Sequence, residues 1–232
     1  MWRVRLVAGG HRQKYGMDYD KTFATATKMP SIRVVLANTA QQDWEMHQLD
    51  MKSAYLNAPL EEEVYMLPPA GLLKPGQENM VCKLKKVLYG LKQAGREWQK
   101  TLTAVFTQKL GFKRSAVDHS IFFRREGEEH TIIAIATDNM AVTSKRASDV
   151  LRFKSKIQKY FAILDGGELH WFLGFEIRRD QIARNVSINQ QSYIERMVEK
   201  FQLTSAKRVT TPMDPDGQFS KDQSLSTPSQ EF

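Results

Sequence analysis

The sequence predicts an α+β fold in which antiparallel strands pack on helices. Helical and strand periodicities are mixed along the 232 residues, and several strands come in pairs joined by short polar turns, as hairpins do. Hydrophobic residues make up 41% of the chain. That content is enough for one sizeable core or for two small subdomains that share a cleft.

The first part of the chain predicts a strand, a helix and a second strand. The strand at 3–8 has no partner before it, so we expect the chain to begin within a domain. Pro30 then precedes a helix whose apolar residues share one face, namely Ile32, Val35, Leu36 and Ala40. Apolar and polar residues alternate over 44–50, which predicts a strand ending at Asp50.

Short strands and a long helix are expected next. The strands are predicted at 62–67 and 80–84, and the Gly- and Pro-containing stretch between them predicts a loop. The helix at 95–110 has an apolar stripe and is followed by Gly111, where a C-cap glycine is expected; the stripe consists of Trp98, Leu102, Val105, Phe106 and Leu110.

Hairpins dominate the second half. Strands are predicted at 120–124 and 130–137, and a tight turn at Asp138-Asn139 leads to another at 140–143. The remaining expected elements are a helix at 148–161, strands at 169–178 and 186–188, and a helix at 192–201. From residue 212 the chain is rich in Pro, Asp, Gly, Ser and Gln, which predicts a disordered tail at 212–232.

Composition narrows the class of partner. Lys and Arg total 34 against 26 Asp and Glu, a net charge of +8, which favours polyanions such as nucleic acid but is found in many proteins that bind none. With Cys82 alone an internal disulfide is impossible, and no Cys/His cluster has zinc spacing. The N-terminus lacks a signal-peptide pattern and no apolar run approaches the length of a membrane span, so we expect an intracellular protein without a membrane partner.

Two carboxylates carry the candidate chemistry. Asp50 ends a predicted strand, and Asp138 lies in a turn beside the apolar segment 132–136. Taken singly, a carboxylate at a strand end is more often a solvated turn residue. Two of them brought together by a sheet can hold Mg²⁺, which activates an attacking oxygen and neutralises a leaving pyrophosphate.

Several motifs, in order, resemble the reverse-transcriptase domain of copia-type retrotransposons from Arg3 to about Met213. They are Arg5-Leu6-Val7-Ala8 with Asp18-Tyr19; His47-Gln48-Leu49-Asp50-Met51-Lys52-Ser53-Ala54-Tyr55-Leu56-Asn57; Glu61-Glu62-Glu63-Val64-Tyr65-Met66; Leu88-Tyr89-Gly90-Leu91-Lys92-Gln93; and Phe172-Leu173-Gly174-Phe175-Glu176-Ile177. The resemblance implies a right-hand polymerase fold. Its parts are partial fingers at 1–45, a palm at 46–178 with a fingers insertion at about 60–95, and the start of a thumb at 179–211.

The resemblance also implies residue roles. Asp50 and Asp138 are expected to bind two Mg²⁺ ions, with Mn²⁺ as a substitute, and Tyr55 to exclude a 2′-hydroxyl, although Tyr55 also suits a core position. Nucleotide contacts are expected from Arg3, Arg5, Ser53, Ala54, Tyr55, Tyr89 and Gly90, with a solvated strand face as the alternative for the two arginines. Primer positioning is expected from Trp171, Phe172, Leu173 and Gly174, where β-core packing is the alternative for Phe172 and Leu173.

One position departs from the family pattern. The second of two adjacent catalytic aspartates is replaced by Asn139, which offers a carbonyl oxygen but no charge. A unit charge beside a divalent ion contributes on the order of several kcal/mol, so its loss is expected to slow the reaction roughly a thousandfold. Asn139 is therefore a catalytic position that we expect to be impaired.

Three hypotheses remain open from the sequence. The first is an RNA-directed DNA polymerase whose partners are a primed RNA or DNA template, deoxynucleoside triphosphates and other domains of a parent polyprotein. The second is a non-catalytic nucleic-acid-binding remnant of a partial, degenerate copy. The third is a non-functional fossil of the retroelement.

Overall fold

A computed structural model describes residues 5–69, 71–73, 75–77, 79–207 and 209–210. The chain forms two compact units, Met1–Gln190 and Gln191–Phe232. Arg3 and the tail expected at 212–232 lie outside the described residues. The predicted palm boundary at 178 falls inside strand β10 of the first unit.

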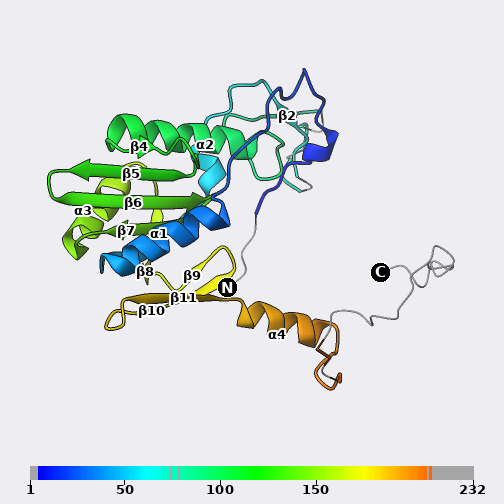
Figure 1. Cartoon of the computed structure of the whole chain (residues 1–232). Coiled ribbons are helices and arrows are strands. Elements are labelled where there is room, and N and C mark those ends of the chain that lie inside the picture. The colour runs from blue at the N-terminus through cyan, green and yellow to red at the C-terminus, as the bar shows by residue number, and fades with distance from the viewer. Residues whose placement is uncertain (1–4, 70, 74, 78, 208, 211–232) are drawn as a thin grey trace. The chain divides into compact units, whose positions relative to one another are not determined.

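A six-stranded antiparallel sheet is the centre of the first unit (Figure 1). The strand order is β4-β5-β6-β7-β1-β8, and each neighbouring pair is antiparallel. The strands are β1 (Glu45–Met51), β4 (Lys113–Arg114), β5 (Ile121–Glu126), β6 (Glu129–Ala136), β7 (Asn139–Ser144) and β8 (Ile163–Glu168). The α+β class is thus confirmed.

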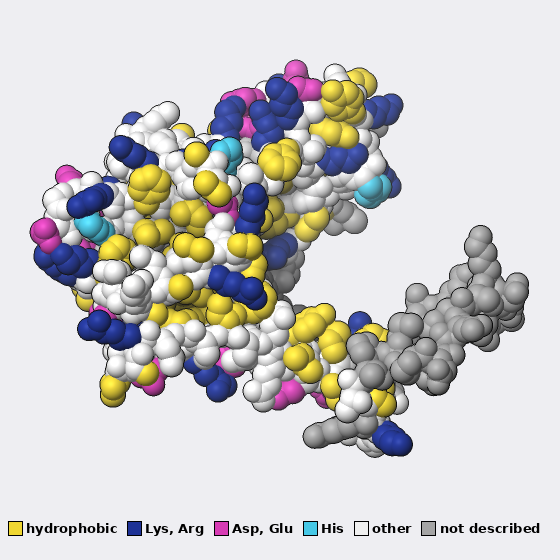
Figure 2. Space-filling model, viewed as in Figure 1, with side chains coloured by type: hydrophobic (Ala, Val, Ile, Leu, Met, Phe, Trp, Pro, Cys, Tyr) yellow, Lys and Arg dark blue, Asp and Glu magenta, His cyan; other side chains and the backbone are white. Residues whose placement is uncertain are grey.

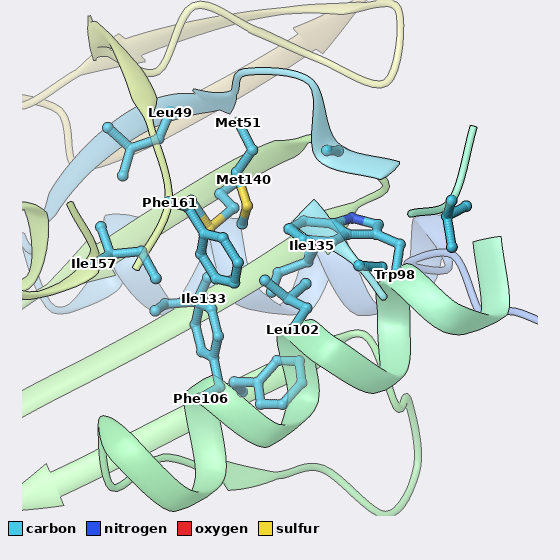
Figure 3. Packing of buried hydrophobic residues seen from close by; sticks show 14 of the residues in the cluster. Leu49, Met51, Trp98, Leu102, Phe106, Ile133, Ile135, Met140, Ile157 and Phe161 are labelled. Atoms are coloured by element: carbon cyan, nitrogen blue, oxygen red, sulfur yellow. The ribbon is translucent and has the colours of Figure 1, made fainter. Parts of the chain in front are cut away.

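One face of this sheet packs on α2 (Ala94–Ala104) and α3 (Ala147–Ile157). The strands contribute alternate residues such as Ile133 and Ile135, because successive side chains point to opposite faces. Figure 3 shows Trp98, Leu102 and Phe106 pointing from the helical segment toward these strand residues.

The opposite face packs on α1 (Met29–Gln41) and on a three-stranded antiparallel sheet. That sheet has the order β11-β10-β9, with β9 (Trp171–Phe172), β10 (Phe175–Asp180) and β11 (Asn185–Asn189). Small residues of the central strands, Ala134, Ala136 and Ala141, face this side. Their size lets α1 and the smaller sheet approach closely.

The remaining elements of the first unit are short. They are η1 (Gly10–Arg12), η2 (Ala54–Asn57), and the antiparallel pair β2 (Tyr65–Met66) and β3 (Cys82–Lys83). The second unit contains α4 (Gln191–Lys200). Among the described residues, no helix is both long and apolar enough to cross a membrane.

The structure corrects several expected elements. The described part of 3–8 forms no strand: Val7 makes one parallel bridge to Tyr89. The helix expected to reach residue 110 changes at Val105 into a π-helical turn, η3 (Val105–Lys109), in which the N–H of Leu110 bonds to the Val105 carbonyl. The helix expected at 148–161 ends at Ile157.

The strands differ as well. Strand β4 was not expected, and the strands expected at 62–67 and 80–84 form only at Tyr65–Met66 and Cys82–Lys83. The strand expected at 169–178 is divided, because Leu173 (φ 53°) and Gly174 (φ 78°) adopt left-handed conformations and turn the chain between β9 and β10. Strand β8 was not expected at all. Its Asp165-Gly166-Gly167 composition is typical of a turn, and it becomes a strand by pairing with β1.

On the face seen in Figure 2, hydrophobic side chains gather where α1 and the central sheet lie in Figure 1. Lys and Arg side chains are spread around that area and alternate with Asp and Glu. This face is therefore not a continuous basic surface.

Candidate active site

Three of the predicted site residues, Asp50, Asp138 and Asn139, lie where β1 ends beside the β6–β7 turn. Asp50 is the cross-strand partner of Asn139, and Asn139 in turn pairs with Ala136, so Thr137 and Asp138 form a two-residue turn. Opposed residues of an antiparallel pair point to the same face of the sheet. The side chains of Asp50 and Asn139 consequently share one face.

Asp138 is tied to β1 by its backbone. The N–H of Met51 donates a hydrogen bond to the Asp138 carbonyl over 2.8 Å. The two aspartates, far apart in sequence, therefore stand on adjacent stretches of backbone. The convergence of the two carboxylates on one metal site stays a prediction.

The turn residue Thr137 has an unusual backbone. Its φ of 57° lies in the left-handed region, which a β-branched residue rarely adopts. The indole Nε1–H of Trp98 donates to the Thr137 carbonyl over 2.7 Å. Trp98 is buried and packs edge-on against Phe161, so the donor is rigidly held.

Asn139 makes a contact that an aspartate at this position could not make. Its Nδ2 donates to Oδ1 of Asp138 over 3.1 Å, whereas two carboxylates would repel each other. The described residues contain no group of three His, Cys, Asp or Glu side chains arranged to hold a metal ion. By residue type alone, two carboxylates and an amide oxygen are donors that suit Mg²⁺, which is commonly bound by one or two carboxylates together with substrate phosphates.

Tyr55 lies beside the turn. It belongs to η2, whose preceding residue Ser53 is exposed and left-handed (φ 53°), and whose first residue Ala54 is buried. Burial raises the pKa of the Tyr55 phenol, and the negative charges of Asp138 and Tyr89 raise it further, while a hydrogen bond with Thr137 acts in the opposite direction. The Tyr55 hydroxyl is therefore protonated near neutral pH, and it lies close enough to Asp138 for the carboxylate charge to raise its pKa.

A second group of predicted residues surrounds Tyr89. The Tyr55 and Tyr89 ring centroids are 4.8 Å apart, and the Arg5 guanidinium lies 5.0 Å from the Tyr89 centroid. The Ala8 N–H bonds to the Tyr89 carbonyl over 2.8 Å. Gly90 has a φ of 92°, and a Cβ built there would lie 2.1 Å from the Ala8 carbonyl oxygen, so only glycine fits.

The predicted primer-positioning residues divide into two kinds. Phe172 is buried in the core between the central sheet, α1 and the three-stranded sheet. This agrees with the alternative that Phe172 is a β-core residue. Trp171 and Leu173 are 47% and 41% exposed, and Gly174 completes the turn between them and β10. These residues lie far along the chain from the turn at Thr137-Asp138. They are connected to β1, because the Trp171 N–H donates a hydrogen bond to the side chain of Gln48.

Sequence reasoning overlooked three side chains that hydrogen-bond to distant segments: Trp98, Gln48 and Gln93. Trp98 was assigned to an apolar stripe, although a buried indole N–H needs an acceptor, and that need was the available signal. Gln48 occupies the same strand face as Asp50, which the alternation could have indicated. Gln93 is fully buried and bonds to the Gln13 side chain and the Asp18 carbonyl; no sequence signal predicts this link.

Comparison with known proteins identifies the class. Residues 1–215 match the family model described as reverse transcriptase (RNA-dependent DNA polymerase), and the chain belongs to this family. Its relatives include the retrovirus-related Pol polyprotein from transposon TNT 1-94 of Nicotiana tabacum, which is 38% identical over 91% of the chain and 16% of the relative. The resemblance to copia-type reverse transcriptases is thereby confirmed.

Two other relatives are also transposon proteins. The retrovirus-related Pol polyprotein from transposon RE1 of Arabidopsis thaliana is 35% identical over 94% of the chain and 15% of the relative. A putative transposon Ty5-1 protein of Saccharomyces cerevisiae is 26% identical over 71% of the chain and 53% of its own length. The chain thus spans less than a fifth of the two plant polyproteins that it matches.

Proposed function

We propose that the chain carries out template-directed addition of deoxynucleotides to a primer, with Asp50 and Asp138 as metal ligands. The observation that supports this most directly is the cross-strand pairing of Asp50 with Asn139 next to the Met51–Asp138 hydrogen bond. In this reaction the primer 3′-oxygen bonds to the α-phosphorus of the nucleotide and pyrophosphate leaves. Bound Mg²⁺ supplies the Lewis acid that neutralises charge on the phosphates.

The residues around Tyr55 suit a nucleotide pocket. The Tyr55 ring is half-buried and lies tilted against Tyr89, and its role in this proposal is to exclude a 2′-hydroxyl. Backbone N–H groups at Ser53 and Ala54 are assigned to the triphosphate, and Arg5 adds positive charge beside Tyr89. Tyr89 and Gly90 form the floor under the template–nucleotide pair, and the turn at Trp171–Gly174 positions the primer end.

The palm is assigned to 46–178 with the fingers insertion at about 60–95, while residues 1–45 are assigned to the fingers and residues 179–211 to the thumb. The polymerase is impaired by Asn139, since the amide supplies no charge to a metal. The Asn139–Asp138 hydrogen bond also uses an Asp138 oxygen that metal binding would require.

Primer extension on a homopolymer template tests the proposal, first with Mg²⁺ and then with Mn²⁺. We expect Asn139→Asp to raise the rate by roughly a thousandfold over the natural chain. Asp50→Asn in the Asn139→Asp background should abolish extension. If the Asn139→Asp chain does not extend a primer with either ion, the polymerase proposal fails.

The second candidate is a non-catalytic nucleic-acid-binding domain, favoured by the loss of the third carboxylate together with the net charge of +8. Filter binding over a salt titration tests it, since phosphate contacts give a steep negative slope of log affinity against log salt. A flat slope would exclude this candidate. A chain that neither extends primers nor binds nucleic acid would be a fossil of the element.

A further inference from the structure

The side chain of Gln48 joins strand β1 to the connection between β8 and β9. Its Oε1 accepts hydrogen bonds from the backbone N–H groups of His170 (3.2 Å) and Trp171 (3.1 Å). Its Nε2 donates to the Gly166 carbonyl over 3.4 Å. A single amide therefore holds both ends of the segment 166–171.

Gln48 and Asp50 share one face of the same strand. They are two residues apart on β1, opposite Ala141 and Asn139 of β7, and the side-chain period of a strand is two. The rise of a strand places their Cα atoms about 7 Å apart. A rigid strand thus fixes the distance between the candidate metal ligand and the Trp171 backbone.

The Gln48 side chain occupies space that is free because residue 166 is a glycine. A Cβ at Gly166 would lie 2.6 Å from Cγ and 2.8 Å from Nε2 of Gln48. Any side chain at Gly166 would therefore push the amide away from its partners. Meanwhile the Trp171 side chain stays 47% exposed although its backbone is held, so the ring is available to a ligand.

We propose that Gln48 is a positioning residue that sets the primer 3′ end at a fixed distance from the metal ligands. This inference rests on the proposed function, because it takes Trp171–Gly174 as the primer-positioning turn. Gln48 itself touches no reacting atom. It acts through the two N–H groups that it binds at the start of β9.

The experiment is single-turnover primer extension in the Asn139→Asp chain, with Gln48→Leu, Gln48→Glu and Gly166→Ala added separately. A primer end displaced by about 1 Å slows the chemical step by up to about 100-fold. We expect the rate constant of Gln48→Leu to fall about 10- to 100-fold while the dissociation constant of the primed template changes less than about threefold. Gln48→Glu keeps the oxygen that accepts from His170 and Trp171 but loses the donor to Gly166, so it should recover part of the rate. Gly166→Ala should resemble Gln48→Leu. The matched control is Gln158→Leu, at the exposed C-cap glutamine that follows α3, which should leave the rate unchanged.

A purely structural role for Gln48 would predict a smaller burst amplitude with an unchanged rate constant, and that result would overturn the proposal. Equal slowing in Gln48→Leu and Gln48→Glu would overturn it as well. If the Asn139→Asp parent extends no primer, the proposed function fails and the primer-positioning role fails with it. Hydrogen exchange at the His170 and Trp171 amides then tests their hydrogen bonds to Gln48 independently of activity. Protection that is lost in Gln48→Leu and kept in Gln48→Glu supports these hydrogen bonds. Unchanged exchange in both variants would reject them.

Discussion

Asp50 and Asn139 are directly opposed on β1 and β7, and the Asn139 amide donates to the neighbouring Asp138 carboxylate. An uncharged residue therefore sits between two acids on one edge of the sheet. This arrangement relieves a repulsion that the family's aspartate pair would create. The same replacement that lowers the expected activity is expected to favour the metal-free fold.

The Asn139→Asp chain should consequently depend on metal for stability. We expect its free energy of unfolding in EDTA to be about 1 kcal/mol lower than that of the natural chain, because three carboxylates then share a partly solvated site. Mg²⁺ at a hundredfold excess over its dissociation constant should restore about 2.7 kcal/mol. Urea unfolding with and without Mg²⁺ measures both effects. An equal response of the two chains to Mg²⁺ would argue against metal binding at these residues.

Trp98→Phe should loosen the turn that carries Asp138. The phenyl ring can keep the packing against Phe161, but the Thr137 carbonyl loses the indole N–H. Thr137 is exposed and the hydrogen bond is only part-buried, so water can replace the indole donor, and we expect the loss of one net hydrogen bond, about 0.5–1.5 kcal/mol. Thermal and urea unfolding measure the loss, and Trp44→Phe serves as the comparison, because that ring lies half-buried and edge-on to His130. A loss no larger than that of Trp44→Phe would show that the indole N–H is not needed.

Gly90→Ala and Gly16→Ala form a matched pair. Both glycines have left-handed φ values, 92° and 80°, but only Gly90 has backbone within van der Waals range of a new Cβ. Gly16→Ala should cost about 1–2 kcal/mol from conformational strain alone. Gly90→Ala should cost more than about 3 kcal/mol, since the Ala8 carbonyl must also move. Equal losses in chemical denaturation would contradict the close approach.

The pH dependence of stability should report His47. Burial lowers the pKa of His47, and the positive charge of Lys154 lowers it further; Lys154 Nζ lies 3.0 Å from Nδ1. The unfolded chain then binds more protons than the folded one below the ordinary histidine pKa of about 6.5. The free energy of unfolding should therefore fall as the pH drops through 6.5.

Urea unfolding between pH 7.5 and 5.5 checks this sign. His47→Gln should flatten the slope, and His11→Gln, at an exposed histidine, should not. At lower pH the Asp165 carboxylate adds a second loss. Its pKa is lowered chiefly by the hydrogen bond from Lys154, so its contribution is present above about 3.8 and disappears as the folded group protonates. A slope that persists in His47→Gln would assign the effect to other groups.

Elements with strong periodicity were predictable from the sequence. The apolar run of β6 gave its bounds to within one residue, and the one-sided apolar pattern of α1 gave the helix but not its start, because Pro30 lies inside it. Strand β8 was missed, since its Asp-Gly-Gly centre has no strand propensity and pairs only because β1 lies beside it. The break between β9 and β10 depends on a left-handed Leu173, which local sequence does not signal.

The candidate site shows the same division. Asp50 and Asp138 could be proposed from a strand end, a turn and a family resemblance. Their supports could not, because Trp98 and Gln48 act through hydrogen bonds to carbonyl or N–H groups 39 and 123 residues away in the chain. Such contacts depend on tertiary structure rather than on residue type.

The π-helical turn at Val105–Lys109 has a consequence for insertions and deletions in this helix. A π-turn accommodates one residue more than the α-helix it interrupts. Deleting Val105 would let the backbone close into regular α-helical bonding, yet Phe106 would take the place of the deleted residue, about 100° away around the helix axis. A deletion before Phe106 would swing this ring away from Phe112, Phe122 and Phe153, which it contacts at centroid distances of 5.5, 5.0 and 5.9 Å. The length of this helix is therefore constrained by an aromatic cluster, while its backbone alone would tolerate a shorter chain.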